Sequence, residues 1–270
     1  MSSFSKEPHL NSVSALITDL ARSLGFLSRF PVAGRFFEGH SGEMSRTPRA
    51  FPLAGVVIAA PAGLFLTLLL GFGAGATLAA FAAVTLQILL SGGLHEDGLA
   101  DCADGLGGGA SREKALEIMK DSRVGSYGVL ALLLSVGIKV SAIASLINKL
   151  EPINVVLCLI GMAALSRALM VWHWHALPAA RPDGVAASLG KPDDQSLYTA
   201  LLFGLGIATM AIVPFAGFHP LVVSVVISVA SAYGFQHYVS RRLGGQTGDT
   251  IGATQQICEM MALATLSIAL

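Results

Sequence analysis

Charged residues are scarce in this chain: aspartate, glutamate, lysine and arginine make up only 13% of its 270 residues. The 17 basic and 17 acidic side chains cancel to a formal net charge of zero, so the composition offers no electrostatic basis for binding nucleic acid. Cysteine is equally rare, and Cys102, Cys158 and Cys258 form an odd set without paired spacing. Neither a disulfide framework nor a zinc site is indicated.

Hydrophobic residues, in contrast, make up 53% of the chain. A helix needs ~20 apolar residues to cross a hydrocarbon core roughly 30 Å thick, and seven runs approach that length. These predicted spans are 51–73, 74–94, 129–148, 153–172, 197–216, 221–238 and 251–270. The last run carries Gln255, Gln256 and Glu259 in its first two turns, so a re-entrant or shallow helix is an alternative there. We expect an all-α, polytopic membrane helix bundle of about seven transmembrane helices, with residues 1–270 forming a single integral membrane domain.

Basic residues are concentrated in the segment 1–50 and in the connections after the second, fourth and sixth predicted spans. The connections after the first, third and fifth spans contain only one basic residue, Lys149. The positive-inside rule therefore puts the N-terminus and the basic connections in the cytoplasm, and seven spans would put the C-terminus outside. Residues 13–30 carry leucines at helical spacing, which predicts an amphipathic helix that lies on the inner membrane surface or packs against the bundle. Ser111 is a candidate cap for a second short helix on this cytoplasmic face.

The connection 95–128 opens with the most polar run of the chain, His95-Glu-Asp-Gly-Leu-Ala-Asp-Cys-Ala-Asp-Gly105. If the run is helical, the spacing of four and then three places Asp97, Asp101 and Asp104 on one face. Carboxylates this close repel one another unless a cation lies among them. Hard oxygen ligands suit Mg²⁺, with Mn²⁺ as a second choice, so we predict a metal site here, with Glu96 as a further candidate ligand.

Two more polar segments are expected at the same face. Asp121 is either another metal ligand or a partner that orients Arg123, and a simple surface ion pair is the plain alternative. The connection 241–254 is rich in glycine and leads into a helix, and such turns expose backbone N–H groups that bind phosphate. Its candidate phosphate-facing residues are Gly244, Gly245, Gln246, Thr247 and Thr250. Asp249 adds a carboxylate, and a helix cap by Asp249 or Thr250 is the plain alternative.

Polar residues in and beside the fourth predicted span are open to two interpretations. Arg167 is costly in lipid and is a candidate for bidentate phosphate binding. The sequence Trp172-His-Trp-His175 favours an aromatic belt at the headgroup level over a metal site. The connection 181–195 is loop-like and is either a substrate contact or a solvated turn.

Three ordered motifs resemble one known family of membrane enzymes. They are Gly92-Gly-Leu-His-Glu-Asp-Gly-Leu-Ala-Asp-Cys-Ala-Asp-Gly105, Glu117-Ile-Met-Lys-Asp-Ser-Arg-Val-Gly125 and Gly244-Gly-Gln-Thr-Gly-Asp-Thr-Ile-Gly-Ala253. Together they resemble the cobalamin synthase family, the adenosylcobinamide-GDP ribazoletransferases, and the resemblance covers nearly the whole chain. The chain departs from that pattern at Glu96, where an apolar residue is common, and at Gln256, where a glutamate is expected. The second departure weakens the assignment of position 256 as a metal ligand and favours Glu259 as the candidate instead.

The resemblance implies a Mg²⁺-dependent enzyme of the bacterial inner membrane whose active site faces the cytoplasm. Its substrates would be adenosylcobinamide-GDP and α-ribazole or α-ribazole 5′-phosphate, and its products adenosylcobalamin or its 5′-phosphate and GMP. For this phosphoryl-group transfer we assign Asp97, Asp101 and Asp104 as the principal metal ligands. Asp121 and Asp249 either complete the metal shell or deprotonate the attacking hydroxyl.

The remaining candidate residues are assigned to the phosphate groups of the substrate. Arg123 and Arg167 would neutralise phosphate charge. His95, Gly98 and Gly105 of the acidic run join the residues of the glycine-rich connection as candidate substrate contacts. The lipid bilayer is an expected partner, and association into a homo-oligomer or with other cobalamin-pathway enzymes is left open.

Two other classes of protein fit parts of the pattern. The run D-G-L-A-D-x-x-D is similar to the signature of CDP-alcohol phosphotransferases, but it lacks the arginine after the alanine and the later pair of aspartates at the expected spacing. A transporter of a divalent cation or a corrinoid would need polar residues near the bilayer midplane and access from both sides. The acidic residues are instead expected at one face, which favours an enzyme.

Overall fold

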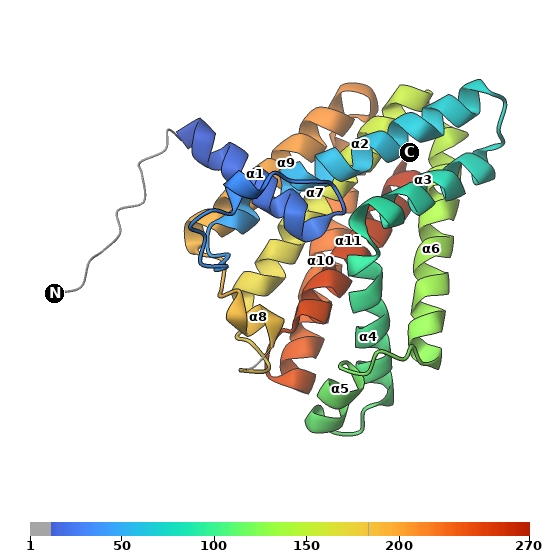
Figure 1. Cartoon of the computed structure of the whole chain (residues 1–270). Helices are drawn as coiled ribbons and strands as arrows, with labels where there is room; N and C mark the ends of the chain where they lie inside the picture. The colour runs from blue at the N-terminus through green and yellow to red at the C-terminus, as the bar shows by residue number, and fades with distance from the viewer. Residues whose placement is uncertain (1–11, 183) are drawn as a thin grey trace.

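The computed structural model describes residues 12–182 and 184–270, and every regular element in this part of the chain is a helix (Figure 1). The α-helices are α1 (Ser12–Leu27), α2 (Phe51–Gly71), α3 (Ala76–Ser91), α4 (Leu94–Gly108), α5 (Arg112–Ile118), α6 (Ser126–Ile147), α7 (Pro152–Ala176), α8 (Val185–Ser188), α9 (Asp194–Ala216), α10 (Phe218–Leu243) and α11 (Gly248–Ala269). Two 3₁₀ turns, Gly34–Phe36 and Thr47–Ala50, join α1 to α2. The all-α helix bundle expected from the sequence is confirmed.

The number of membrane spans differs from the expectation of about seven. Five of the described helices are long and apolar enough to cross a membrane, and a sixth span results if α3 and α4 are counted together. These two helices meet at an angle of 91°. The bend is made by Gly92 and Gly93, whose φ angles of 68° and 70° lie in the left-handed region that glycine adopts without strain. The acidic run is therefore the helix α4 itself and not a loop.

The last predicted span forms α11, which is not among the candidate spans. Its polar residues Gln255, Gln256 and Glu259 lower its hydropathy, and all three are buried against neighbouring helices. Helix α11 packs against α4, α6, α7 and α10, so protein surrounds it where lipid was expected (Figure 1). The polar positions of α11 mark a protein interior, not a lipid-facing surface.

Helix α1 confirms the helix predicted near residues 13–30, and its second half packs on the bundle. Leu27 is buried in a cluster with Phe51 at the start of α2. Asp19 is buried as well and accepts a 2.7 Å hydrogen bond from Nε of Arg49. Val13 and Ile17, on the first turns, are exposed. From Asp19 onward, α1 therefore packs against the bundle, which is the second of the two alternatives predicted from the sequence. The predicted helix after Ser111 is also present as α5, and the Ser111 hydroxyl accepts a hydrogen bond from the Lys114 N–H.

Candidate functional site

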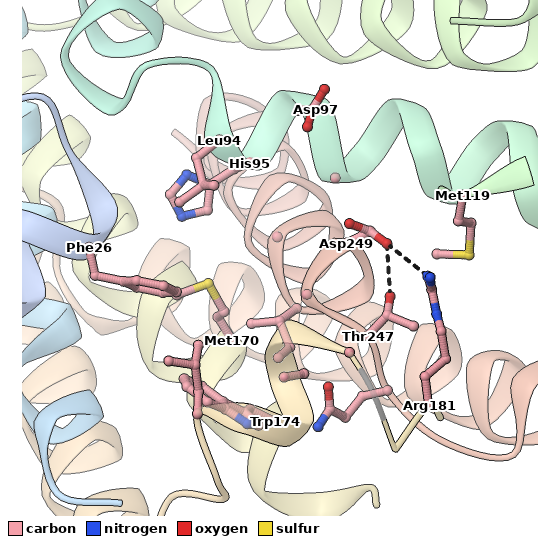
Figure 2. A pocket seen from close by; sticks show the side chains of 18 of the residues that line it. Phe26, Leu94, His95, Asp97, Met119, Met170, Trp174, Arg181, Thr247 and Asp249 are labelled. Carbon is pink, nitrogen blue, oxygen red and sulfur yellow. Dashed lines mark hydrogen bonds and ion pairs between the residues drawn. The ribbon is translucent and has the colours of Figure 1, made fainter. Parts of the chain in front are cut away.

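A cavity of about 410 Å³ lies where several helix ends meet (Figure 2). The C-terminal end of α1, the first turns of α4 and α11, the second half of α7 and residues of the 181–189 segment contribute to its wall. Its charged lining residues are Asp97, Lys120, Arg181 and Asp249. This volume lies within the range of ~300–1,000 Å³ that is typical of small-molecule sites.

Helix α4 carries one of the predicted carboxylates in the cavity lining and a second one turn further along. Asp97 in its first turn is exposed and lines the cavity, and Asp101 follows one helical turn later and is half-buried. The negative charges that act on Asp101 are those of Asp97, Asp249 and Asp104. The acidic face predicted from the four-residue spacing is therefore present, and α11 adds a third carboxylate to it.

Gly98 lets α11 approach this acidic face. A β-carbon at position 98 would lie 2.8 Å from the carbonyl oxygen of Asp249 and 3.1 Å from its α-carbon. Any larger residue would therefore collide with the backbone of α11. Gly98 thus serves as a close-packing position, and the contact holds Asp249 beside Asp97.

The first turn of α11 is fixed by a capping box. The Thr247 hydroxyl accepts a hydrogen bond from the Thr250 N–H, and the Thr250 hydroxyl accepts one from the Thr247 N–H. The N-cap is therefore Thr247 and not Asp249 or Thr250, and Thr250 completes the capping box from the third helical position. The Asp249 carboxylate accepts a 3.2 Å hydrogen bond from the Thr247 hydroxyl and lies 3.7 Å from the Arg181 guanidinium (Figure 2). Burial raises the pKa of Asp249, the charge of Asp97 adds to this shift, and the Thr247 hydrogen bond and Arg181 oppose it.

The glycine-rich turn before α11 holds the loop that carries Arg181. Gly244 ends α10 with a φ of 70°, and Gly245 lies so close to the Pro178 carbonyl that no β-carbon would fit. The Gln246 N–H donates to the Pro178 carbonyl, and the Ala180 N–H donates to the Gln246 carbonyl, both at 2.8 Å. These bonds place Arg181 next to Asp249. Part of the 181–195 connection thus lines the cavity, as the substrate-contact alternative requires.

Other predicted site residues lie in different surroundings. Both oxygens of Asp104 accept backbone hydrogen bonds, from Gly125 at 2.7 Å and from Gly128 at 2.9 Å, so this carboxylate caps the start of α6. Gly105 packs against α5 through Ala115 and Met119. These contacts give Asp104 and Gly105 structural roles at the joint between α4, α5 and α6.

Asp121 and Arg123 form an exposed ion pair with a closest distance of 2.6 Å. The neighbouring guanidinium lowers the pKa of Asp121 to about 2. Neither residue is among the described residues that line the cavity. The structure therefore matches the plain alternative of a surface ion pair.

Glu96 and Arg167 point into the bundle, where they belong to a buried polar cluster. The cluster surrounds a second, very small cavity, and its members are Gln87, Ser91, His95, Glu96, Lys139, Arg167, Gln255, Gln256 and Glu259. Gln256 bridges opposite charges, because its amide oxygen accepts a 2.7 Å hydrogen bond from Lys139 and its amide nitrogen donates a 2.9 Å bond to Glu96. His95 lines both cavities. Glu96 and Arg167 therefore face other helices and not the acidic surface of α4.

The described residues contain no group of three or more His, Cys, Asp or Glu side chains arranged to hold a metal ion. A cage made entirely by the protein is thus not present in this part of the chain. Magnesium does not require one, because it usually retains water and binds one or two carboxylates together with substrate phosphates. Asp97 and Asp249 line the cavity, and Asp101 lies one turn beyond Asp97 on α4, so the donor set fits a metal that is bound together with a phosphate substrate.

The sequence analysis missed the apolar wall of the cavity, which includes Phe26, Met170 and Trp174 (Figure 2). The interpretation of Trp174 as part of a headgroup belt was wrong: its side chain is buried, and its indole N–H donates a 3.0 Å hydrogen bond to the Gly190 carbonyl. His173 is also buried and forms a 3.1 Å hydrogen bond with the Thr250 hydroxyl. A tryptophan at the end of an apolar helix is typical of both environments, so the sequence held no signal to separate them.

Replacing Gly98 with alanine should lower activity through the contact with Asp249. Alanine favours helix over glycine by ~1 kcal/mol, so a loss of function would arise from the collision with the α11 backbone. Displacement of reacting groups by about 1 Å can cost ~10²-fold, and we expect kcat/KM to fall at least ~10-fold.

Gly108→Ala is the matched control for this substitution. Gly108 lies in the last turn of the same helix and outside the described cavity lining, and the nearest neighbour of its β-carbon would be the Ile118 side chain at 3.7 Å, an ordinary contact distance. Steady-state kinetics of the two variants test the prediction. Equal activities would show that close approach at Gly98 does not position Asp249.

Comparisons with known proteins agree with the resemblance seen in the motifs. The family model described as cobalamin-5-phosphate synthase matches residues 19–267. A protein of Allorhizobium ampelinum named adenosylcobinamide-GDP ribazoletransferase is 68% identical over 96% of this chain and 100% of its own length. Relatives of the same name from a Sinorhizobium species and from Brucella anthropi are 48% and 39% identical, over 93% and 95% of this chain and 96% and 99% of theirs. No solved structure matches. The chain belongs to the cobalamin-5-phosphate synthase family.

Proposed function

We propose that this chain is an enzyme that completes the nucleotide loop of cobalamin. It transfers the adenosylcobinamide phosphate group of adenosylcobinamide-GDP to α-ribazole or α-ribazole 5′-phosphate and releases GMP. The observation that carries the proposal is the presence of Asp97 and Asp249 in the lining of one cavity, with Asp101 one turn beyond Asp97, in a chain whose relatives bear the name of this activity. Charge neutralisation and alignment, which such a site supplies, are the main requirements of phosphoryl transfer.

We further propose Mg²⁺ as the cofactor, with Mn²⁺ as a substitute. Asp97 and Asp101, one turn apart on α4, would hold it, and Asp249 of α11, which lines the same cavity as Asp97, would be either a further ligand or the base. When bound, the cation supplies charge neutralisation on the diphosphate and on the departing GMP. Asp104 supports the site indirectly by joining α4 to the start of α6.

The chemistry assigns distinct roles to the residues of the chain. A ribose hydroxyl of α-ribazole attacks the phosphorus that carries the cobinamide arm, and the bond from that phosphorus to the oxygen of GMP breaks. Arg181 and the N-terminal turn of α11, which lie at the cavity, orient the phosphate groups. When Asp249 does not bind the cation, its carboxylate accepts the hydroxyl proton. Asp121 is the weaker candidate for this step, because it is paired with Arg123 outside the cavity.

The location of the site is part of the proposal. The candidate spans support an integral membrane protein, and the excess of basic residues in alternate connections supports a cytoplasmic active site in the inner membrane. Arg112 and Arg242 lie at the same end of the bundle as the cavity loop, because Arg112 donates to the carbonyls of Leu243 and Ala180 and Arg242 donates to the carbonyl of Gly109.

Release of GMP from adenosylcobinamide-GDP by the purified protein in detergent or nanodiscs tests the proposed function. We expect GMP and an adenosylcobalamin product to appear in equal amounts, and only when α-ribazole and Mg²⁺ are both present. GMP formed without α-ribazole would indicate a hydrolase. Corrinoid or Mg²⁺ uptake by proteoliposomes without GMP release would indicate a transporter.

A further inference from the structure

The cavity has two chemically different ends. Figure 2 shows Asp249, Thr247 and Arg181 together on one side, and Phe26, Met170 and Trp174 together on the other. A substrate that fills both ends must itself be polar at one end and apolar at the other. The phosphate-transfer chemistry accounts only for the polar end.

The apolar end is built from aromatic surfaces held by the core. The ring of Phe26 stacks on Phe51 with centroids 6.1 Å apart and an angle of 17°, and Phe51 in turn contacts Trp174 with centroids 6.2 Å apart. The polar atom of the Trp174 indole is turned to the Gly190 carbonyl, so its hydrogen-bonding capacity is already used. Met170 and Trp174 are each 1% exposed and form the back of this wall, whereas Phe26 is 37% exposed and offers its ring to a ligand. This end therefore suits a flat aromatic group with few hydrogen-bonding atoms.

Two buried polar atoms of cavity-lining residues, Nε2 of His95 and Oε1 of Gln246, have no hydrogen-bond partner among the described residues. Both atoms are covered by surrounding protein, so neither is open to a ligand in the cavity. A guanine base presents several donors and acceptors and would leave most of them unsatisfied against the apolar wall. An aromatic base with few polar atoms loses fewer hydrogen bonds there.

We propose that the apolar end, formed by Phe26, Met170 and Trp174, binds the dimethylbenzimidazole base of α-ribazole. This inference rests on the proposed function, and it assigns which substrate occupies which end of the site. The cavity of about 410 Å³ has room for a nucleoside but not for a corrin macrocycle together with a nucleotide.

The variant Phe26→Ala tests the base-binding role. Phe26 is 37% exposed and stands at the end of α1, so its removal disturbs the core less than a change at Trp174 would. We expect KM for α-ribazole to rise ~10-fold from lost apolar contact, with a much smaller change in kcat and in KM for adenosylcobinamide-GDP. Ile17→Ala is the matched control, because Ile17 is an exposed apolar residue of the same helix outside the described cavity lining.

A second measurement separates this inference from the proposed function. Isothermal titration calorimetry with α-ribazole alone should give a Kd ~10-fold higher for Phe26→Ala than for wild type and for Ile17→Ala. Ribosides of unmethylated benzimidazole should bind wild type less tightly than α-ribazole, with a smaller difference in Phe26→Ala. If Phe26→Ala raises KM for adenosylcobinamide-GDP instead, or leaves both KM values and α-ribazole binding unchanged, the base does not bind at this end. Absence of GMP release by wild-type protein would overturn the proposed function, whatever the binding results.

Discussion

The variant Asp101→Asn should lose at least ~10²-fold in kcat and remain folded. Asparagine keeps the size and shape of the side chain but removes its charge, and one electrostatic group at a transition state is typically worth ~10²–10³-fold. Asp101 is half-buried, one turn after Asp97 on the face that Asp249 approaches. Loss of this carboxylate removes a metal ligand from the proposed site. GMP release at saturating substrate measures the effect.

The stability of Asp101→Asn should be equal to or higher than that of wild type in the absence of metal. Three other carboxylates, Asp97, Asp249 and Asp104, act on Asp101 with the same sign of charge, and removing one of four like charges relieves repulsion. A variant that is inactive and more stable is the expected signature of a functional charge cluster. Thermal unfolding in EDTA measures this quantity.

Two companion variants make the result interpretable. Glu117→Gln removes an exposed carboxylate that pairs with Lys114 on α5, and it should leave activity and stability close to wild type. Asp121→Asn tests whether Asp121 acts in catalysis or only forms a surface ion pair. A catalytic role predicts a large loss of kcat, whereas the exposed pair with Arg123 predicts a small loss. Near-normal turnover by Asp101→Asn would remove this carboxylate from the active site.

The sequence predicted the angular position of the aspartates but not their neighbours. Spacings of four and three place Asp97, Asp101 and Asp104 on one helical face, and α4 has that arrangement. Helical periodicity says nothing about what lies opposite each turn. Because α6 begins beside the last turns of α4, Asp104 meets the N–H groups of Gly125 and Gly128, while Asp97 meets the cavity. Only the tertiary arrangement separates a helix cap from a cavity carboxylate.

The helices themselves were largely predictable because apolar runs of membrane length allow few alternatives. The bend at Gly92 and Gly93 was not, since apolar residues continue up to it and hydropathy carries no angle. Arg181 is held at the site by backbone hydrogen bonds between residues 178–180 and Gln246, which are far apart in sequence. Pairings of this kind depend on the fold of both segments and leave no pattern in either one.

The variant Lys139→Met should destabilise the bundle strongly. Lys139 is 2% exposed, its ammonium lies 3.6 Å from the Glu96 carboxylate, and it donates a 2.7 Å hydrogen bond to Gln256. Removing one member of a buried ion pair leaves the other charge uncompensated, which typically costs ~3–5 kcal/mol. Here the remaining charge would be Glu96, whose second oxygen already has no partner among the described residues. Thermal or denaturant unfolding of the detergent-solubilised protein measures the loss.

The double variant Lys139→Met/Glu96→Leu should recover most of that stability, because removal of both charges leaves no uncompensated ion in the bundle. Lys114→Met is the control, since Lys114 forms an exposed pair with Glu117 and should change stability by no more than ~1 kcal/mol. Glu96 directly precedes Asp97 in the first turn of α4, so the single variant should also lose activity as that turn moves. The double variant should regain folding more fully than turnover, because an apolar residue at position 96 does not restore the bond to Gln256 that ties α4 to α11. If Lys139→Met is no less stable than Lys114→Met, the buried charges do not hold the acidic helix in place, and the position of Asp97 must depend on the packing at Gly98 alone.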